Sequence, residues 1–165
     1  MVINVGSGIG TGPTQLSAFD AALNHAGVAN YNLIYLSSVV PPNSKIVSYK
    51  NRPIPAKSLS GKWGDRLYVV IAERRTSVPN EEVWAGIGWV QDKKTGKGLF
   101  VEHTGENKAS VKRDIHHSLE ALMATRNINF GPIRMQIAGK TCGINPVSVL
   151  VVAVYQSDGW KNYNE

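Results

Sequence analysis

Two stretches of the chain carry apolar residues at helical spacing. In the first, between Pro13 and Gly27, these residues recur three or four positions apart: Leu16, Phe19, Ala22, Leu23 and Ala26. In the second, from 109 to 126, they do the same: Val111, Ile115, Leu119, Leu122 and Met123. Thr14 is a suitable N-cap for the first stretch and Gly27 a suitable C-terminal stop. The pattern therefore predicts two amphipathic helices.

The other apolar blocks are short and rich in Val, Ile, Leu, Tyr and Trp, residues that favour extended backbone. They predict strands in eight ranges: 2–5, 32–38, 45–49, 66–73, 83–90, 99–102, 134–138 and 147–155. The polar, glycine-containing segment 92–98 predicts a hairpin turn between two of these strands. Many strands with only two helices indicate an α+β fold in which the helices cover sheets.

Glycine occupies every second position after the first predicted strand, at Gly6, Gly8, Gly10 and Gly12. This spacing does not fit the G-x-G-x-x-G pattern of a dinucleotide loop, and no phosphate-binding lysine follows it. We therefore expect a flexible turn or a bulged strand here.

The composition indicates one globular domain. The chain has 165 residues, 42% of them hydrophobic and 18% charged, which suits a single domain with a substantial core. Its apolar runs are shorter than the roughly 20 residues that span a bilayer, so no membrane partner is expected. The N-terminal residues do not have the pattern of a signal peptide. Cys142 is the single cysteine, which excludes an internal disulfide and favours a cytoplasmic location.

Charge and histidine spacing argue against two further classes. The net charge is +6 and the pI about 9.5, but no more than two basic residues adjoin. A mildly cationic surface without a nucleic-acid partner is the better interpretation. His116 and His117 are neighbours and point in different directions on the predicted helix, so they do not make the i, i+4 pair of a helical metal site.

Candidate chemistry lies in the segment 32–42, which reads NLIYLSSVVPP. Ser37 and Ser38 stand where an apolar strand gives way to Pro41 and Pro42, which cannot continue a ladder. Backbone strain can be held at such a boundary. A serine hydroxyl can attack the carbonyl that precedes it when its peptide is held away from relaxed geometry.

This segment, the helix sequence 19–23 with Ala26-Gly27, and the later run 98–102, GLFVE, resemble the pyruvoyl-dependent arginine decarboxylases. The resemblance extends over most of the chain and implies a four-layer α-β-β-α sandwich, with 1–165 as a single domain. It also implies that the chain cleaves itself between Ser37 and Ser38 into a short N-terminal and a long C-terminal chain. Ser38 would become the covalent pyruvoyl group.

The resemblance assigns further roles within this site. Asn32 would polarise the Ser37 carbonyl, although the residues alone favour a strand-start or turn residue at this position. Glu102 would donate the proton that follows decarboxylation. Asp20 would bind the guanidinium of the substrate, with Leu16 and Val39 also in contact with it.

The implied reaction converts L-arginine to agmatine and carbon dioxide through a Schiff base to the pyruvoyl group, without metal or pyridoxal phosphate. The family assembles as trimers with active sites between subunits, which implies a homo-oligomer, a trimer or a dimer of trimers. Two alternatives stay open at this point: the same chemistry on another amino acid, and an unprocessed, non-catalytic homologue that acts as a binding or regulatory subunit.

Overall fold

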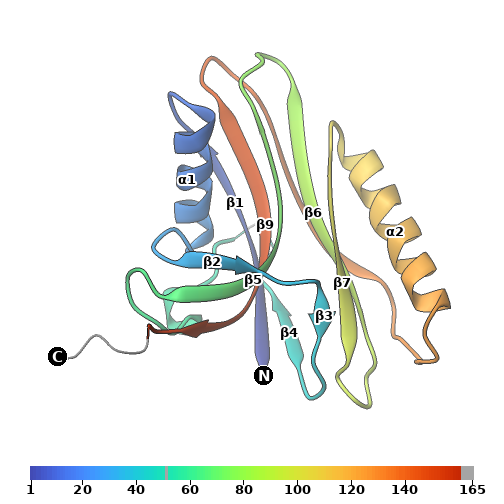
Figure 1. Ribbon diagram of the computed structural model, residues 1–165. Coiled ribbons are helices and arrows are strands. Elements are labelled where there is room, and N and C mark those ends of the chain that lie inside the picture. Colours follow the sequence, from blue (N-terminus) through green and yellow to red (C-terminus); the bar gives the residue numbers. More distant parts are fainter. Residues whose placement is uncertain (51, 161–165) are drawn as a thin grey trace.

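The computed structural model describes residues 1–50 and 52–160, and in these ranges the chain forms nine strands, two α-helices and one 3₁₀ helix (Figure 1). In chain order the elements are β1 (Val2–Thr11), α1 (Gln15–Ala26), β2 (Asn32–Tyr35), β3 (Val39–Val40), β4 (Lys45–Ser48), η1 (Ala56–Ser58), β5 (Arg66–Thr76), β6 (Glu82–Gln91), β7 (Gly98–Gly105), α2 (Lys108–Ala124), β8 (Arg134–Thr141) and β9 (Val147–Asp158). No helix in the described ranges has the length and apolar character needed to cross a membrane.

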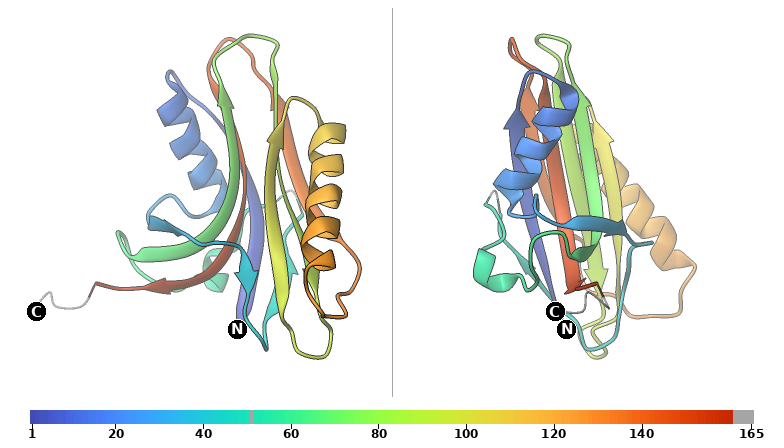
Figure 2. Two further views of the ribbon diagram at one scale, coloured as in Figure 1. Left: turned by 45° about the vertical axis from the view of Figure 1, so that its right-hand side comes forward. Right: turned by 60° about the vertical axis from the view of Figure 1, so that its left-hand side comes forward.

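The strands form two sheets that pack face to face. Sheet A has the order β2-β5-β9-β1-β4, and sheet B has the order β3-β7-β6-β8. Helix α1 covers the outer face of sheet A and α2 covers the outer face of sheet B (Figures 1 and 2). The α+β class and the α-β-β-α layering predicted from the sequence are therefore confirmed.

Alternation along β7 shows how the strands divide their side chains between layers. Phe100 is buried in the core between the two sheets, whereas Leu99 and Val101 pack against α2. Because side chains on a strand point alternately to opposite faces, Glu102 lies on the same face as Phe100 and looks into the inter-sheet layer. This alternation decides which residues of β7 can reach the candidate site.

The alternating glycines belong to a regular strand, so the predicted turn or bulge after Val5 is wrong. β1 continues to Thr11 and pairs with β9 along its length from Asn4 onward. A Cβ at Gly8 or Gly10 would lie 2.0 to 2.4 Å from backbone atoms of Ala22 and Ala18 in α1. The glycines therefore let the helix approach the sheet more closely than any side chain allows.

A second difference concerns the segment predicted as one strand from 32 to 38. β2 ends at Tyr35 in sheet A, and β3 begins at Val39 in sheet B. The chain therefore crosses from one sheet to the other through Leu36, Ser37 and Ser38. Both strands stand at the edges of their sheets, so this crossing closes one side of the sandwich.

Candidate active site

The crossing between the sheets is fixed on both sides of the serine pair. The Leu36 N–H donates to the Val69 carbonyl in sheet A at 2.9 Å, and the Phe100 N–H donates to the Ser38 carbonyl in sheet B at 2.8 Å. Ser37 is exposed between these anchors, and Ser38 has a φ of 68°. This left-handed conformation costs a residue with a side chain about 1–3 kcal/mol. The short crossing therefore holds strain at the residue that follows the Ser37–Ser38 bond.

The side chain of Ser38 meets a carboxylate from the neighbouring strand. Its hydroxyl donates a hydrogen bond to Oε1 of Glu102. His103 points to the other face of β7, where its Nε2 lies 2.8 Å from the Ser118 hydroxyl of α2. The histidine beside Glu102 is thus packed against α2 and takes no part in this pair.

Tyr155 of β9 completes the inner wall of the site. It is 7% exposed, and its hydroxyl donates to the Val39 carbonyl at 3.1 Å. Its ring meets Phe100 edge-on, with centroids 6.1 Å apart. Burial, and to a smaller extent the Glu102 carboxylate, raise the pKa of Tyr155 well above its ordinary value. The phenol therefore remains a hydrogen-bond donor.

The structure brings together some of the residues predicted for the site. Ser37, Ser38, Val39 and Glu102 lie together, and Val39 leaves 60% of its surface exposed. Tyr155 was not predicted, since a tyrosine at the end of an apolar strand has no local feature that marks it.

The other predicted residues lie elsewhere in the same chain. Asn32 begins β2, and its side-chain amide donates to the Gly64 carbonyl at 2.6 Å rather than to Ser37. Asp20 and Leu16 are exposed on α1, beyond the outer face of sheet A (Figure 1). The role of Asn32 at the Ser37 carbonyl, and those of Asp20 and Leu16 at the substrate, stay predictions.

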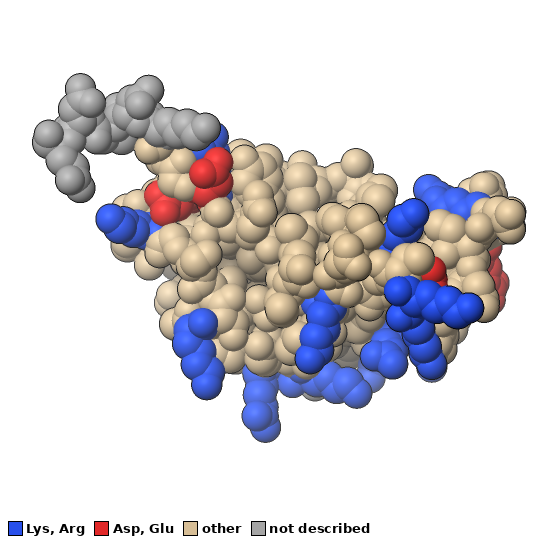
Figure 3. Space-filling view, turned by 90° about the horizontal axis from the view of Figure 1, so that it is seen from below, with Lys and Arg blue, Asp and Glu red and all other residues tan. Residues whose placement is uncertain are grey.

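Basic side chains are dispersed on the face of the molecule that lies at the bottom of Figure 1. Figure 3 shows Lys and Arg side chains spread along this face with uncharged surface between them. Within the ranges that the structure describes, no three His, Cys, Asp or Glu side chains gather in a way that could hold a metal ion. The groups at the crossing that can take part in a reaction are the strained Ser38, the carboxylate of Glu102 and the buried phenol of Tyr155.

The crossing at Ser37 and Ser38 is thus a candidate site at a serine peptide bond, and comparison with known proteins gives the family. The chain matches the model of the pyruvoyl-dependent arginine decarboxylase family over residues 2–155, and it belongs to that family. It is 36% identical to the pyruvoyl-dependent arginine decarboxylase of Halobacterium salinarum, over 94% of this chain and 95% of that protein.

Two further similarities are more partial. The chain is 38% identical to the pyruvoyl-dependent arginine decarboxylase of Thermoplasma volcanium, over 58% of this chain and 50% of that protein. The solved structure of a pyruvoyl-dependent histidine decarboxylase at pH 8 aligns with a TM-score of 0.43 and 14% identity, over 87% of this chain and 62% of that one.

Proposed function

We propose that this chain cleaves itself between Ser37 and Ser38 and then decarboxylates L-arginine to agmatine and carbon dioxide. The observation that supports the proposal best is the conformation of Ser38, strained at a φ of 68° with its hydroxyl on Glu102. Family membership supports the dependence on a pyruvoyl group. The free, buried thiol of Cys142 suits a reducing cytoplasm as the site of action.

In the cleavage reaction Ser38 is the nucleophile and Glu102 receives its proton. The Ser38 Oγ bonds to the Ser37 carbonyl carbon, the carbon–nitrogen bond breaks, and the Ser38 nitrogen takes the proton, which leaves an ester. Loss of the Ser38 α-hydrogen then breaks the Oγ–Cβ bond, so that oxygen stays on Ser37 as part of its new carboxylate. Water finally replaces the nitrogen, which leaves as ammonia. The strained φ of Ser38 disappears in this sequence, because its N–Cα bond is lost.

The surroundings of Ser38 fit the pyruvoyl group that would result. The Phe100 N–H would still bond the Ser38 carbonyl, and β3 would still pair with β7. When present, the group supplies a carbonyl that takes the substrate amine and acts as an electron sink. Glu102 lies beside the Ser38 side chain and can return a proton to the substrate α-carbon after carbon dioxide leaves. Phe100 and Tyr155 keep water away from the inner side of the site.

Recognition of the substrate side chain requires a second copy of the chain. Asp20 supplies a carboxylate that suits a guanidinium, but it is exposed on α1, which covers the outer face of sheet A, whereas Ser38 lies in the crossing between β2 and β3. Leu16 and Val39 are apolar and exposed, by 69% and 60%. We therefore propose that α1 of one subunit meets the Ser38 region of the next in a homo-oligomer, a trimer or a dimer of trimers.

Complementation between two inactive variants tests this shared site. Asp20→Asn and Ser38→Ala should each be inactive alone, while their co-expression should restore about a quarter of wild-type turnover through mixed interfaces. Co-expression that restores no activity, although mass spectrometry shows mixed oligomers, would contradict a site built from two chains.

The substrate is tested by release of labelled carbon dioxide from a panel of amino acids. Arginine should be the preferred substrate, with lysine, ornithine and histidine processed far more slowly, since only arginine presents a planar guanidinium for a bidentate contact. The Ser38→Ala variant is the control for background decarboxylation. Equal turnover of another amino acid would replace arginine in the proposal.

A further inference from the structure

Tyr155 contacts the backbone carbonyl of Val39, the residue that follows Ser38. β3 is the edge strand of sheet B, and its ladder with β7 places Val39 opposite Leu99. The Ser38 carbonyl points to β7 and accepts the Phe100 N–H. Because successive carbonyls of a strand point in opposite directions, the Val39 carbonyl points away from β7. The Tyr155 hydroxyl donates to it at 3.1 Å.

We propose that Tyr155 is a positioning residue that holds the strained Ser38 backbone in the geometry needed for self-cleavage, an inference that rests on the proposed function. The Ser38–Val39 peptide is held through two successive carbonyls. Its own carbonyl, from Ser38, accepts the Phe100 N–H of sheet B, and the next carbonyl, from Val39, accepts the Tyr155 hydroxyl of sheet A. Release of either carbonyl would let this peptide turn and Ser38 relax from its φ of 68°. The hydroxyl of Ser38 would then no longer be held at Glu102.

The surroundings of Tyr155 keep its hydroxyl in place. The ring is buried and fixed edge-on against Phe100, which itself supplies the N–H that bonds Ser38. The edge-on contact between Tyr155 and Phe100 therefore joins the two residues whose hydrogen bonds hold the Ser38 and Val39 carbonyls. Since its phenol stays protonated, it acts as a donor and not as a proton-transfer group.

The test compares Tyr155→Phe with Tyr49→Phe, wild type and Ser38→Ala in cell-free synthesis followed by denaturing gels over time. Tyr49 is a matched control, because its hydroxyl bonds Asn4 and Ser58, at 3.4 and 3.1 Å, and touches neither serine of the pair. Tyr155→Phe should cleave about tenfold more slowly, and Tyr49→Phe at the wild-type rate. The pH profile of cleavage should keep its shape in Tyr155→Phe, since the lost group positions and does not titrate.

Four results separate this inference from the function on which it rests. If wild type does not cleave, the proposed function fails and Tyr155 has no cleavage to assist. If wild type cleaves and Tyr155→Phe cleaves within twofold of it, the positioning role is wrong. If Tyr155→Phe and Tyr49→Phe slow cleavage equally, the effect is general and not specific to Tyr155. If Tyr155→Phe loses one limb of the pH profile of cleavage, Tyr155 titrates in the reaction. Either result contradicts the positioning role. Circular dichroism spectra check that each variant is folded before its cleavage rate is compared with that of wild type.

Discussion

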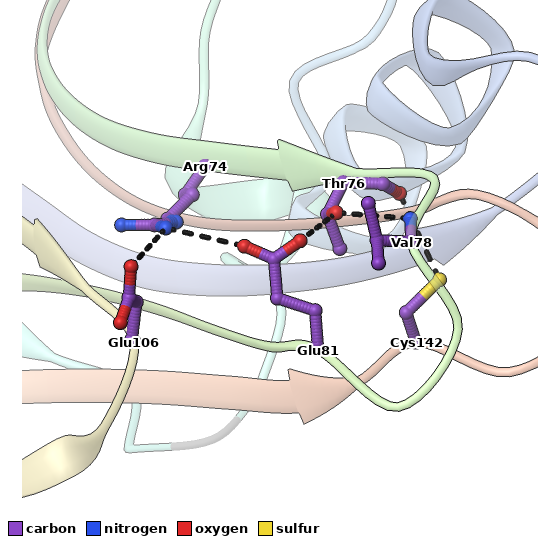
Figure 4. Close-up of polar contacts among 6 residues, drawn as sticks. All are labelled: Arg74, Thr76, Val78, Glu81, Glu106 and Cys142. Carbon is purple, nitrogen blue, oxygen red and sulfur yellow. Dashed lines mark hydrogen bonds and ion pairs between the residues drawn. The ribbon is translucent and has the colours of Figure 1, made fainter.

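The layer between the two sheets holds a carboxylate near each end, and the two have opposite surroundings. At one end Glu81 lies 3.4 Å from Nη2 of Arg74 and accepts a hydrogen bond from the Thr76 hydroxyl (Figure 4). Arg74 also lies 3.5 Å from Glu106, which precedes α2. At the other end Glu102 accepts the Ser38 hydroxyl beside Phe100 and Tyr155. In the described ranges it forms no ion pair.

The difference separates a carboxylate in an ion pair from the carboxylate that we propose to be reactive. Arg74 ties β5 of sheet A to the segment that leads into α2, so the charge of Glu81 is used to hold the sandwich together. Glu102 instead faces the Ser38 hydroxyl and aromatic rings. We therefore propose different roles for Glu81 and Glu102, because in the described ranges Glu81 has a cation beside it and Glu102 does not.

Among substitutions of these residues, we expect the largest loss of turnover at Glu102. Glu102→Gln keeps the size of the side chain and removes the proton carrier, so turnover of arginine should fall about 10²- to 10⁴-fold and self-cleavage should slow. Release of labelled carbon dioxide per processed chain measures the first effect, and denaturing gels measure the second. Unchanged turnover would remove Glu102 from the mechanism.

Arg74→Met should act on stability alone. It leaves Glu81 and Glu106 without their cation, and because Arg74 is 27% exposed we expect a loss of about 1–2 kcal/mol in the free energy of unfolding. Urea titration measures the loss. Turnover per folded, processed chain should stay at the wild-type level, and a drop of tenfold or more would mean that the two ends of the layer are coupled.

Glu81→Gln is the matched counterpart of Glu102→Gln and should have a smaller effect. It removes the charge that faces Arg74 but can keep the hydrogen bond from Thr76, so a loss of about 1 kcal/mol in stability is expected. Activity should not change. Equal losses of turnover in the two glutamine variants would erase the distinction drawn between these carboxylates.

The smallest effect concerns stability at alkaline pH. The pKa of Tyr155 is raised in the folded chain above its ordinary value of 10.0, so the unfolded chain loses this proton first as the pH rises. The stabilising contribution is complete below pH 10 and is lost above it. Tyr155→Phe should therefore show a shallower fall in unfolding free energy above about pH 10 than wild type does. Parallel curves in urea titrations at a series of pH values would contradict the raised pKa.

Local pattern was sufficient for the two helices and the α+β class, whereas the four layers and the role of the serine pair were expected from the family resemblance. Helical spacing located α1 and α2, and the prolines after Val40 indicated that the strand must end near Ser38, where the positive φ is found. The glycines of β1 were misjudged because alternate glycines favour turns locally, while their actual reason is the approach of α1. That reason lies in another element and cannot be read from spacing.

The remaining parts of the site depend on contacts that are distant in sequence. The hydrogen bond from Tyr155 to Val39 joins residues 116 positions apart, and no local sequence pattern at either residue indicates it. Asn32 was placed by resemblance near Ser37, but strand pairing directs its amide to Gly64. Asp20 and Leu16 would reach the site only in the proposed homo-oligomer, which the spacing of residues within one chain does not indicate.

Intact-protein mass spectrometry under denaturing conditions is the most direct test of self-cleavage between Ser37 and Ser38. Freshly purified wild type should give two masses, for residues 1–37 and 38–165, with the longer chain blocked at its N-terminus and shifted by the conversion of Ser38 to pyruvoyl. Ser38→Ala should give one full-length mass. A single full-length mass for wild type would show that the strained serine does not react, and it would contradict the account given for this site.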